Sequence, residues 1–179
     1  LTRHTLGYEF VHVIPCGIDG APLVKKGAFL RGSHVNNDDF VILWSGSYNT
    51  WADIDTLFNA VNYAMKKDKK IKFVSTGGAV DSHDELTYRR FLDLIQKSEF
   101  KDRFIMLGWV AAGSLPAIYE ESDLGVNVDK SCYETLLGSR HRLLDWMHSG
   151  LPFITTPPSE MTQTLCDNKL AFTFLQGDA

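Results

Sequence analysis

The chain has 179 residues, of which 18 are basic and 22 acidic for a net charge of −4, and 44% are apolar. This length suits one domain with a substantial core, and the apolar fraction excludes a wholly disordered chain. The net negative charge argues against a nucleic-acid-binding protein, because such domains usually carry a basic face. No apolar run approaches the roughly 20 residues that cross a bilayer, and no signal peptide opens the chain. Since the first residue is Leu1, we expect a piece of a longer protein.

The cysteines and histidines indicate neither a disulfide framework nor a zinc site. Cys16, Cys132 and Cys166 are odd in number and contain no CxxC-type pair. We therefore expect buried or half-buried free thiols in a reducing compartment. The six histidines form no HExxH motif or comparable metal-binding spacing.

Two regimes follow one another along the chain. Residues 1–39 are irregular and rich in glycine, and we expect them to form an inter-domain segment that enters the domain, whereas residues 40–179 alternate between apolar strands and amphipathic helices. Strands are predicted at residues 40–44, 71–75, 104–107, 123–128, 151–155 and 170–175. Helices are predicted between these strands, with Ser114, Ser139 and Ser159 as N-caps and Gly150 as a stop. This rhythm predicts an α/β fold, an open, doubly wound parallel sheet of the Rossmann-like type.

Ligands of such sheets bind beyond the carboxyl ends of the strands, so the loops after the strands are the candidate site. No GxGxxG follows the first strand and no GxxxxGK[ST] occurs, which argues against a nicotinamide cofactor and excludes a P-loop. Gly46 and Gly77 stand at strand ends, where a glycine either lets a phosphate approach the backbone or simply makes a tight turn.

The segment from residue 134 to 150 carries the clearest chemistry. Gly138 and Ser139 are predicted to open a helix, with Arg140 and Arg142 in its first turn. Cations are unfavourable at a helix N-terminus, so an anion such as a diphosphate would compensate them, unless they pair with carboxylates such as Glu134. Asp145, further along the helix, could accept hydrogen bonds from a sugar diol or pair with Arg142 or His141.

Other candidates have simpler explanations. Asp53-Ile54-Asp55 reads as the metal-binding pattern DxD, but it falls inside a predicted helix rather than at a strand end. The polar residues 81–85 are typical of a solvated loop before a helix. Among the tryptophans, Trp109 directly follows the third strand and could stack on a base, whereas core packing is expected of the others.

Three stretches together resemble a known family. Residues 104–124 follow the pattern F-x-x-x-G-x-v … l-x-x-x-y-x-x-a-D-l, residues 143–156 follow l-x-E-a-m-a-x-G-x-P-v-v-a-t, and residues 13–19 follow v-i-P-n-G-v-D. Their order and spacing resemble the C-terminal half of GT-B glycosyltransferases, especially glycosyltransferase family 4. A bacterial group 1 subgroup with a W-x-G-G-x-x-x-W-x-D loop and an R-x-R-x-L-D helix is similar at Trp44, Gly46, Trp51 and Asp53, and at Arg140, Arg142, Leu144 and Asp145.

The resemblance implies the donor-binding lobe of a retaining, metal-independent enzyme that transfers a sugar from a nucleotide-diphosphate sugar, without a further cofactor. The base would lie near Gly108 to Val110, a stretch that includes Trp109. The diphosphate would lie at Gly138 and Ser139, and the ribose at Asp145, which stands where the family has the second Glu of an E-x7-E pair. Further donor contacts are expected at the strand ends, from Gly46, Ser47, Tyr48 and Gly77.

The chain departs from the family pattern in two places. The first Glu of the pair falls at Leu137, and Glu134 lies three residues away as a possible substitute. The family's Arg and Lys after the first strand are replaced by Ser47, Tyr48, Asn49 and Thr50. Diphosphate neutralisation is therefore expected from Arg140 and Arg142.

In such enzymes two lobes close around donor and acceptor, and positive groups stabilise the departing nucleoside diphosphate. The catalytic residues would be shared with the absent first lobe, so we expect this fragment to bind donor without turning it over. The resemblance further implies a cytoplasmic bacterial protein of polysaccharide biosynthesis, acting on a cell-envelope glycan or lipid-linked sugar, with peripheral membrane contact in the full-length protein. The alternatives are a GT-B relative such as a nucleotide-sugar epimerase or phosphorylase, and a non-catalytic doubly wound binding domain.

Overall fold

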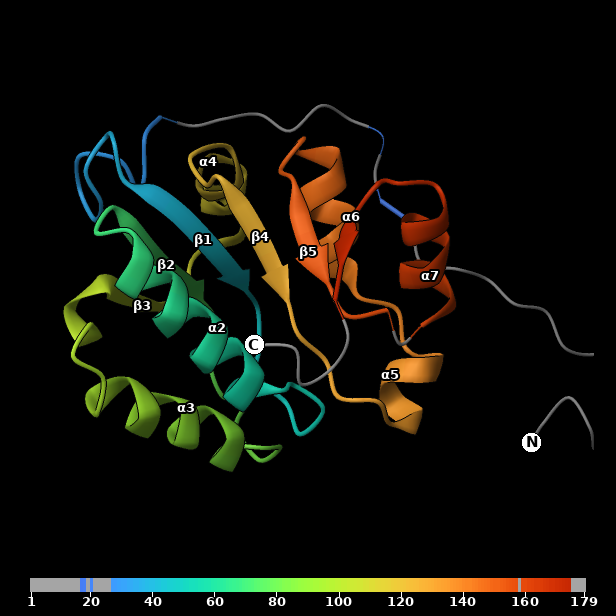
Figure 1. The fold of residues 1–179 in the computed structure, drawn as a ribbon. Helices are drawn as coiled ribbons and strands as arrows, with labels where there is room; N and C mark the ends of the chain where they lie inside the picture. The colour runs from blue at the N-terminus through green and yellow to red at the C-terminus, as the bar shows by residue number, and fades with distance from the viewer. Residues whose placement is uncertain (1–16, 19, 21–26, 158, 175–179) are drawn as a thin grey trace, which may run out of the picture.

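A computed structural model describes residues 17, 18, 20, 27–157 and 159–174. Within these residues six parallel strands form one sheet in the order β3-β2-β1-β4-β5-β6 (Figure 1). The strands are β1 Phe40–Ser45, β2 Ile71–Thr76, β3 Phe104–Gly108, β4 Leu124–Asn127, β5 Phe153–Thr155 and β6 Phe172–Thr173. The predicted doubly wound parallel sheet is confirmed.

Helices connect the strands and cover both faces of the sheet. They are α2 Ile54–Lys67, α3 Leu86–Gln96, α4 Leu115–Glu120, α5 Tyr133–Leu137, α6 His141–His148 and α7 Glu160–Asp167. Figure 1 shows α2 and α3 on one face, with α4 and α6 on the other. None of the helices in the described residues is long and apolar enough to cross a membrane.

The alternation of side chains along β1 divides the core into two halves. Ile42 and Trp44 pack with α2 and α3 on one face, and Val41 and Leu43 pack with α4, α6 and α7 on the other. All four side chains are buried, as expected of a central parallel strand covered on both sides. This double burial explains why the strand reads as a continuous apolar run.

The strand order reverses at β1, which pairs with β2 on one side and with β4 on the other. The carboxyl ends of β1 and β2 are in register, with Ser45 opposite Thr76. Gly77 follows with a φ of +82°, and a Cβ there would collide with the carbonyl of Gly46. Gly77 is thus required for the close packing of two loops at the switch point.

Part of the predicted entry segment packs on the domain. Leu30 and Val35 are buried in the core on the α6 side of the sheet. A carboxylate oxygen of Glu121 accepts the backbone N–H groups of Phe29, Leu30 and Arg31, at 3.0, 2.5 and 3.1 Å. Residues 1–16, 19 and 21–26 of that segment lie outside the described residues, so the domain boundary after residue 39 stays a prediction.

Two of the three predicted N-cap residues occupy the N-cap position, and one does not. Ser159 caps α7, with its hydroxyl accepting from Thr162 N–H as expected. Ser114 is the N-cap residue of α4 as predicted, with Pro116 in the first turn. Its side chain makes no cap hydrogen bond, and a 3-10 turn at Ala112–Ser114 leads into the helix. The prediction for Ser139 is wrong: α6 begins at His141, and Arg140 occupies the N-cap position.

The thiols that the structure describes match the expectation from sequence. Cys132 and Cys166 are free and half-buried. Cys16 lies outside the described residues.

Helix α6 is held against the sheet by a large side chain over a glycine. Trp146 is fully buried, and its ring lies over Gly125 of β4. A Cβ on Gly125 would come within 2.7 Å of a ring carbon of Trp146. The distance between α6 and the strand is therefore set by the missing side chain.

We expect Gly125→Ala to lower the free energy of unfolding by about 1–3 kcal/mol, the usual cost of overpacking a core. Urea titration measures the effect. Gly113→Ala is the matched control, because a Cβ there meets no atom within 4 Å. Equal stabilities of the two variants would contradict the role given to Gly125.

Candidate functional site

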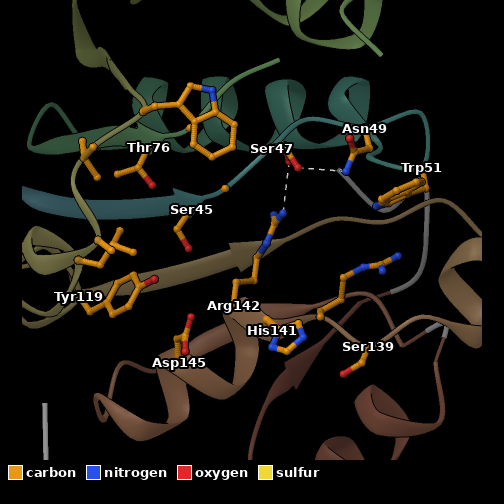
Figure 2. A pocket seen from close by; sticks show the side chains of 17 residues that line it. Ser45, Ser47, Asn49, Trp51, Thr76, Tyr119, Ser139, His141, Arg142 and Asp145 are labelled. Carbon is orange, nitrogen blue, oxygen red and sulfur yellow. Dashed lines mark hydrogen bonds between the residues drawn. The ribbon is translucent and has the colours of Figure 1, made fainter. Parts of the chain in front are cut away.

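A cavity of about 480 Å³ lies at the carboxyl ends of the strands, beside the topological switch (Figure 2). The loops after β1, β2 and β3 form one side, and α4 with the start of α6 forms the other. Its lining residues are Ser45, Gly46, Ser47, Asn49, Trp51, Thr76, Gly77, Trp109, Val110, Ala112, Leu115, Tyr119, Ser139, Arg140, His141, Arg142 and Asp145.

Arg142 reaches from α6 across to the loop that follows β1. Its Nη2 donates to the carbonyl of Ser47 at 3.3 Å, and its guanidinium carbon lies 4.3 Å from the ring centroid of Trp44. Its Nη1 is buried and has no hydrogen-bond partner. Burial lowers the pKa of Arg142 to about 10, which leaves the side chain protonated at neutral pH.

Arg140, in contrast, is already paired with a carboxylate. Its Nε donates to Oδ2 of Asp129 at 2.7 Å, and the Asp129 side chain is only 3% exposed. The guanidinium also lies 5.5 Å from the ring centroid of Trp51, while its Nη2 is buried without a partner. The pairing alternative left open by the sequence therefore applies to Arg140, although the partner is Asp129 and not Glu134.

Asp145 faces the cavity and forms no ion pair with Arg142 or His141 in the structure. Burial raises the pKa of its carboxyl group, and the neighbouring His141 and His148 partly oppose that rise. Figure 2 shows the carboxylate turned toward Tyr119 and Ser45. An unpaired carboxylate at this place can accept hydrogen bonds from a ligand.

Trp109 is 64% exposed at the cavity edge, and its indole Nε1 donates to the carbonyl of Ala79 at 3.1 Å. This bond fixes the ring while leaving it accessible for stacking. Val110 beside it packs against the core on the α6 side. Trp44 and Trp146 are core residues, as expected.

Three of the predicted site residues do not line the cavity. Tyr48 is fully buried, stacks on Trp44 and forms a 2.6 Å hydrogen bond with Ser75, so its side chain belongs to the core. Glu134 is exposed on α5. Gly138 ends α5 in an extended conformation instead of opening α6. The other predicted residues come together at the cavity: Gly46, Ser47, Gly77, Trp109, Val110, Ser139, Arg140, Arg142 and Asp145.

Sequence reasoning missed several lining residues. Asn49 lines the cavity from the loop after β1. Loops at the carboxyl ends of strands are where ligands bind, so the position of Asn49 was a signal, but the sequence pattern predicts no ligand contact for its side chain. The core packing expected of Trp51 is wrong, because this side chain is only half-buried and lines the cavity. Tyr119 and His141 lie in helical segments whose pattern gives no sign of which side chains turn toward a ligand.

Unpartnered polar atoms gather at this cavity. Eight buried side-chain polar atoms of the described residues lack a hydrogen-bond partner, and four of them belong to the lining: Ser45 Oγ, Asn49 Oδ1, Arg140 Nη2 and Arg142 Nη1. A buried donor or acceptor left unsatisfied costs about 1–3 kcal/mol. The arrangement therefore favours a ligand with several polar groups, at least one of them anionic.

The two carboxylates of the DxD pattern have structural partners elsewhere. Asp53 lies at the N-cap of α2, not inside the helix, and accepts from the N–H and the hydroxyl of Thr56 at 3.2 and 3.0 Å. Asp55 accepts from Arg90 at 2.8 Å. Among the described residues no group of three His, Cys, Asp or Glu side chains could hold a metal ion.

The raised pKa of Asp145 predicts a stability effect with a definite sign. The unfolded chain releases this proton near 3.8, whereas the folded chain holds it to higher pH, so ionisation of Asp145 costs stability above pH 3.8. We expect Asp145→Asn to raise the thermal midpoint at pH 7, with the gain shrinking as the pH falls toward 4. Thermal melts across this range measure it.

Asp93→Asn removes a carboxylate at an exposed position on α3 and is the matched control. A gain for Asp145→Asn that is the same at every pH would exclude carboxylate desolvation as its cause.

Comparison with known proteins gives the family. A family model described as glycosyl transferases group 1 matches residues 39–179. The C-terminal domain of LpcC, a glycosyl transferase group 1 family protein from Francisella tularensis, superposes with a TM-score of 0.63 at 16% identity, covering 80% of this chain and 70% of that domain.

Two longer solved proteins share the fold. HepE from Anabaena in complex with UDP-glucose gives a TM-score of 0.62 at 15% identity, over 78% of this chain and 36% of its own. The pneumococcal O-GlcNAc transferase GtfA in complex with UDP and GlcNAc gives 0.60 at 19% identity, over 82% of this chain and 26% of its own. The chain thus spans about a third or less of these two proteins.

A search of curated proteins finds no match. At such identities the structural matches show the fold alone, a Rossmann-like lobe as in the C-terminal domains of GT-B enzymes. The family model, however, covers well over half of the sequence. The chain therefore belongs to the group 1 glycosyl transferases.

Proposed function

We propose that this chain is the donor-binding lobe of a retaining, metal-independent glycosyltransferase, and that its cavity takes a nucleotide-diphosphate sugar. The observation that carries the proposal is the guanidinium of Arg142, which presents a buried, unpartnered Nη1 at a cavity between the strand ends. A diphosphate supplies the charge and the oxygen acceptors that this group lacks. The UDP-glucose in the HepE structure is consistent with that choice.

The rest of the nucleotide fits the remaining lining. The unpaired carboxylate of Asp145 accepts hydrogen bonds from the ribose hydroxyls. The exposed, fixed indole of Trp109 and the backbone at Val110 receive the base. Asp145 is one methylene shorter than the Glu of the family pattern but presents the same two acceptor oxygens.

Arg142 also accounts for the missing cations of the family pattern. That pattern places an Arg and a Lys in the loop after the first strand, where this chain has residues 47–50. The structure brings the guanidinium of Arg142 to the same loop, bonded to the carbonyl of Ser47. We infer that the positive charge for the diphosphate comes from α6 in this protein.

The chemistry assigned to this lobe is electrostatic. The protonated guanidinium stabilises the negative charge that develops on the departing nucleoside diphosphate. This role needs no metal ion. Retention of configuration, a cell-envelope glycan as acceptor, and a cytoplasmic place at the inner face of a bacterial membrane complete the proposal for the whole protein. They rest on the family resemblance, since acceptor binding belongs to the other lobe.

A ligand panel with two variants tests the donor site. The panel contains UDP, GDP, ADP, TDP and inorganic pyrophosphate, measured by calorimetry and thermal shift. Arg142→Gln is expected to weaken both the preferred diphosphate and pyrophosphate by roughly ten- to a hundredfold, the range for a hydrogen bond to a charged group. Asp145→Asn should weaken the nucleotide but not pyrophosphate, because only the nucleotide carries a ribose.

Arg90→Gln is the matched control, since this arginine is exposed and pairs with Asp55 away from the cavity. A ligand at 100 times its dissociation constant adds about 2.7 kcal/mol of stability, so binding is easily detected. If no diphosphate binds at millimolar concentration, to this chain or to the longer protein, the proposed function is wrong.

Metal independence makes a separate prediction. Because the positive charge comes from Arg142, EDTA should leave the affinity for the preferred diphosphate unchanged, and Mg²⁺ should not raise it. Calorimetry with and without chelator measures both. A loss of binding in EDTA would show that a metal ion bridges protein and diphosphate.

A further inference from the structure

The sugar of the donor has a place in the cavity that follows from the proposed function, on which this inference rests. A nucleotide-diphosphate sugar is a linear ligand: base, ribose, diphosphate, sugar. With the ribose at Asp145 and the diphosphate at Arg142, an extended donor places its sugar on the side of Arg142 away from Asp145. Figure 2 shows Asp145 and Tyr119 on one side of Arg142, with Asn49 and Trp51 on the other. The sugar therefore lies toward Asn49 and Trp51.

This end of the cavity holds one amide and one guanidinium with free hydrogen-bonding capacity. The Asn49 amide nitrogen donates to the hydroxyl of Ser47 at 3.1 Å, and the amide oxygen is buried without a partner. Turning the amide over would exchange the two atoms and still leave one unpaired. Arg140 lies over Trp51 and carries the buried, unpartnered Nη2. Together the two side chains can pair with adjacent hydroxyl groups.

Asp129 decides which kind of sugar this end accepts. Its buried carboxylate accepts from Arg140 Nε at 2.7 Å and from the side-chain amide of Asn127 at 3.0 Å. The Asp129 backbone N–H donates to the Thr156 hydroxyl at 2.9 Å, which fixes the residue. The ion pair cancels the charge of Arg140 and holds its guanidinium in place. An anionic sugar would gain little from Arg140 and would stand close to the carboxylate of Asp129.

We propose that Asn49 and Arg140 bind the hydroxyl groups of the donor sugar, and that Asp129 makes this subsite selective for neutral sugars over uronic acids. Asp129 is a positioning residue: it acts through Arg140 by neutralising and orienting it. Arg142, in contrast to Arg140, forms no ion pair with any of the described residues.

The experiment compares three ligands that share the base selected in the panel: the free diphosphate, its hexose and its hexuronate. For uracil these are UDP, UDP-glucose and UDP-glucuronate. The unmodified chain is expected to bind UDP-glucose about tenfold more tightly than UDP-glucuronate. Asn49→Ala should weaken UDP-glucose several-fold and leave UDP within twofold, whereas Thr50→Ala, at the exposed neighbouring position, should change neither.

Asp129→Asn tests whether Asp129 controls sugar selectivity, because a purely structural role would not change the preference between the two sugars. Removing the negative charge frees the positive charge of Arg140, so the preference should shift toward UDP-glucuronate by about tenfold or more. A lower thermal midpoint alone does not produce this reversal. If Asp129→Asn fails to fold, the sugar subsite is still tested by Asn49→Ala and by the preference of the unmodified chain for UDP-glucose over UDP-glucuronate.

The outcomes separate this inference from the proposed function. If UDP binds but UDP-glucuronate is bound as well as UDP-glucose, or if Asn49→Ala weakens UDP and UDP-glucose equally, the sugar subsite is wrong and the donor site stands. If no diphosphate binds, both the proposed donor site and the sugar subsite are wrong.

Discussion

The position of α6 depends on Trp146 lying over Gly125, and most of the cavity depends on α6. Leu143 and Trp146 bury one side of this helix against the sheet. Arg142 and Asp145, each adjacent in sequence to one of them, line the cavity beside the strand ends. Because the core is close-packed, the helix cannot slide without disturbing Trp146. Packing on one side of α6 thereby fixes two charged groups at the cavity and keeps the separation between them constant.

Charged groups at the cavity are buried without full compensation, which lowers the stability of the fold. Asp145 is partly buried and forms no ion pair among the described residues. Arg142 is desolvated and contacts the Ser47 carbonyl and the Trp44 ring, and the charge of Asp129 offsets only part of the cost of its burial. Arg140 shows the contrasting solution, since Asp129 neutralises it directly. Sites that bind charged ligands commonly carry such a cost, which the ligand removes on binding. The uncompensated groups are thus a better guide to the ligand than the paired ones.

The sequence predicts the fold of this protein better than it predicts the residues of the candidate site. Apolar residues at 41–44 and at Phe73 and Val74 locate the first two strands, because side chains on both faces of these strands are buried. The sequence places the start of α6 too early, because Gly138 is extended between α5 and α6 and Ser139 gives no sign of this. The position of Tyr48 in the loop after β1 predicts a site residue, but its ring stacks on Trp44 and is buried in the core. Contacts between distant residues, Arg140 with Asp129 for example, have no signal in sequence spacing.

The proposed replacement of the loop cations by Arg142 illustrates why residue spacing in the sequence is an incomplete guide to a binding site. A diphosphate responds to the position of positive charge in space, and not to the element that supplies it. The carboxyl end of β1 lies at the switch point, directly across the cavity from α6, so a long side chain from either element can reach the same phosphate. The loop after β1 can then use small residues such as Gly46 and Ser47, whose backbone receives the incoming guanidinium. A family's cations can therefore be missing from their usual loop in the sequence, while the folded chain brings a positive charge to the same place from another element.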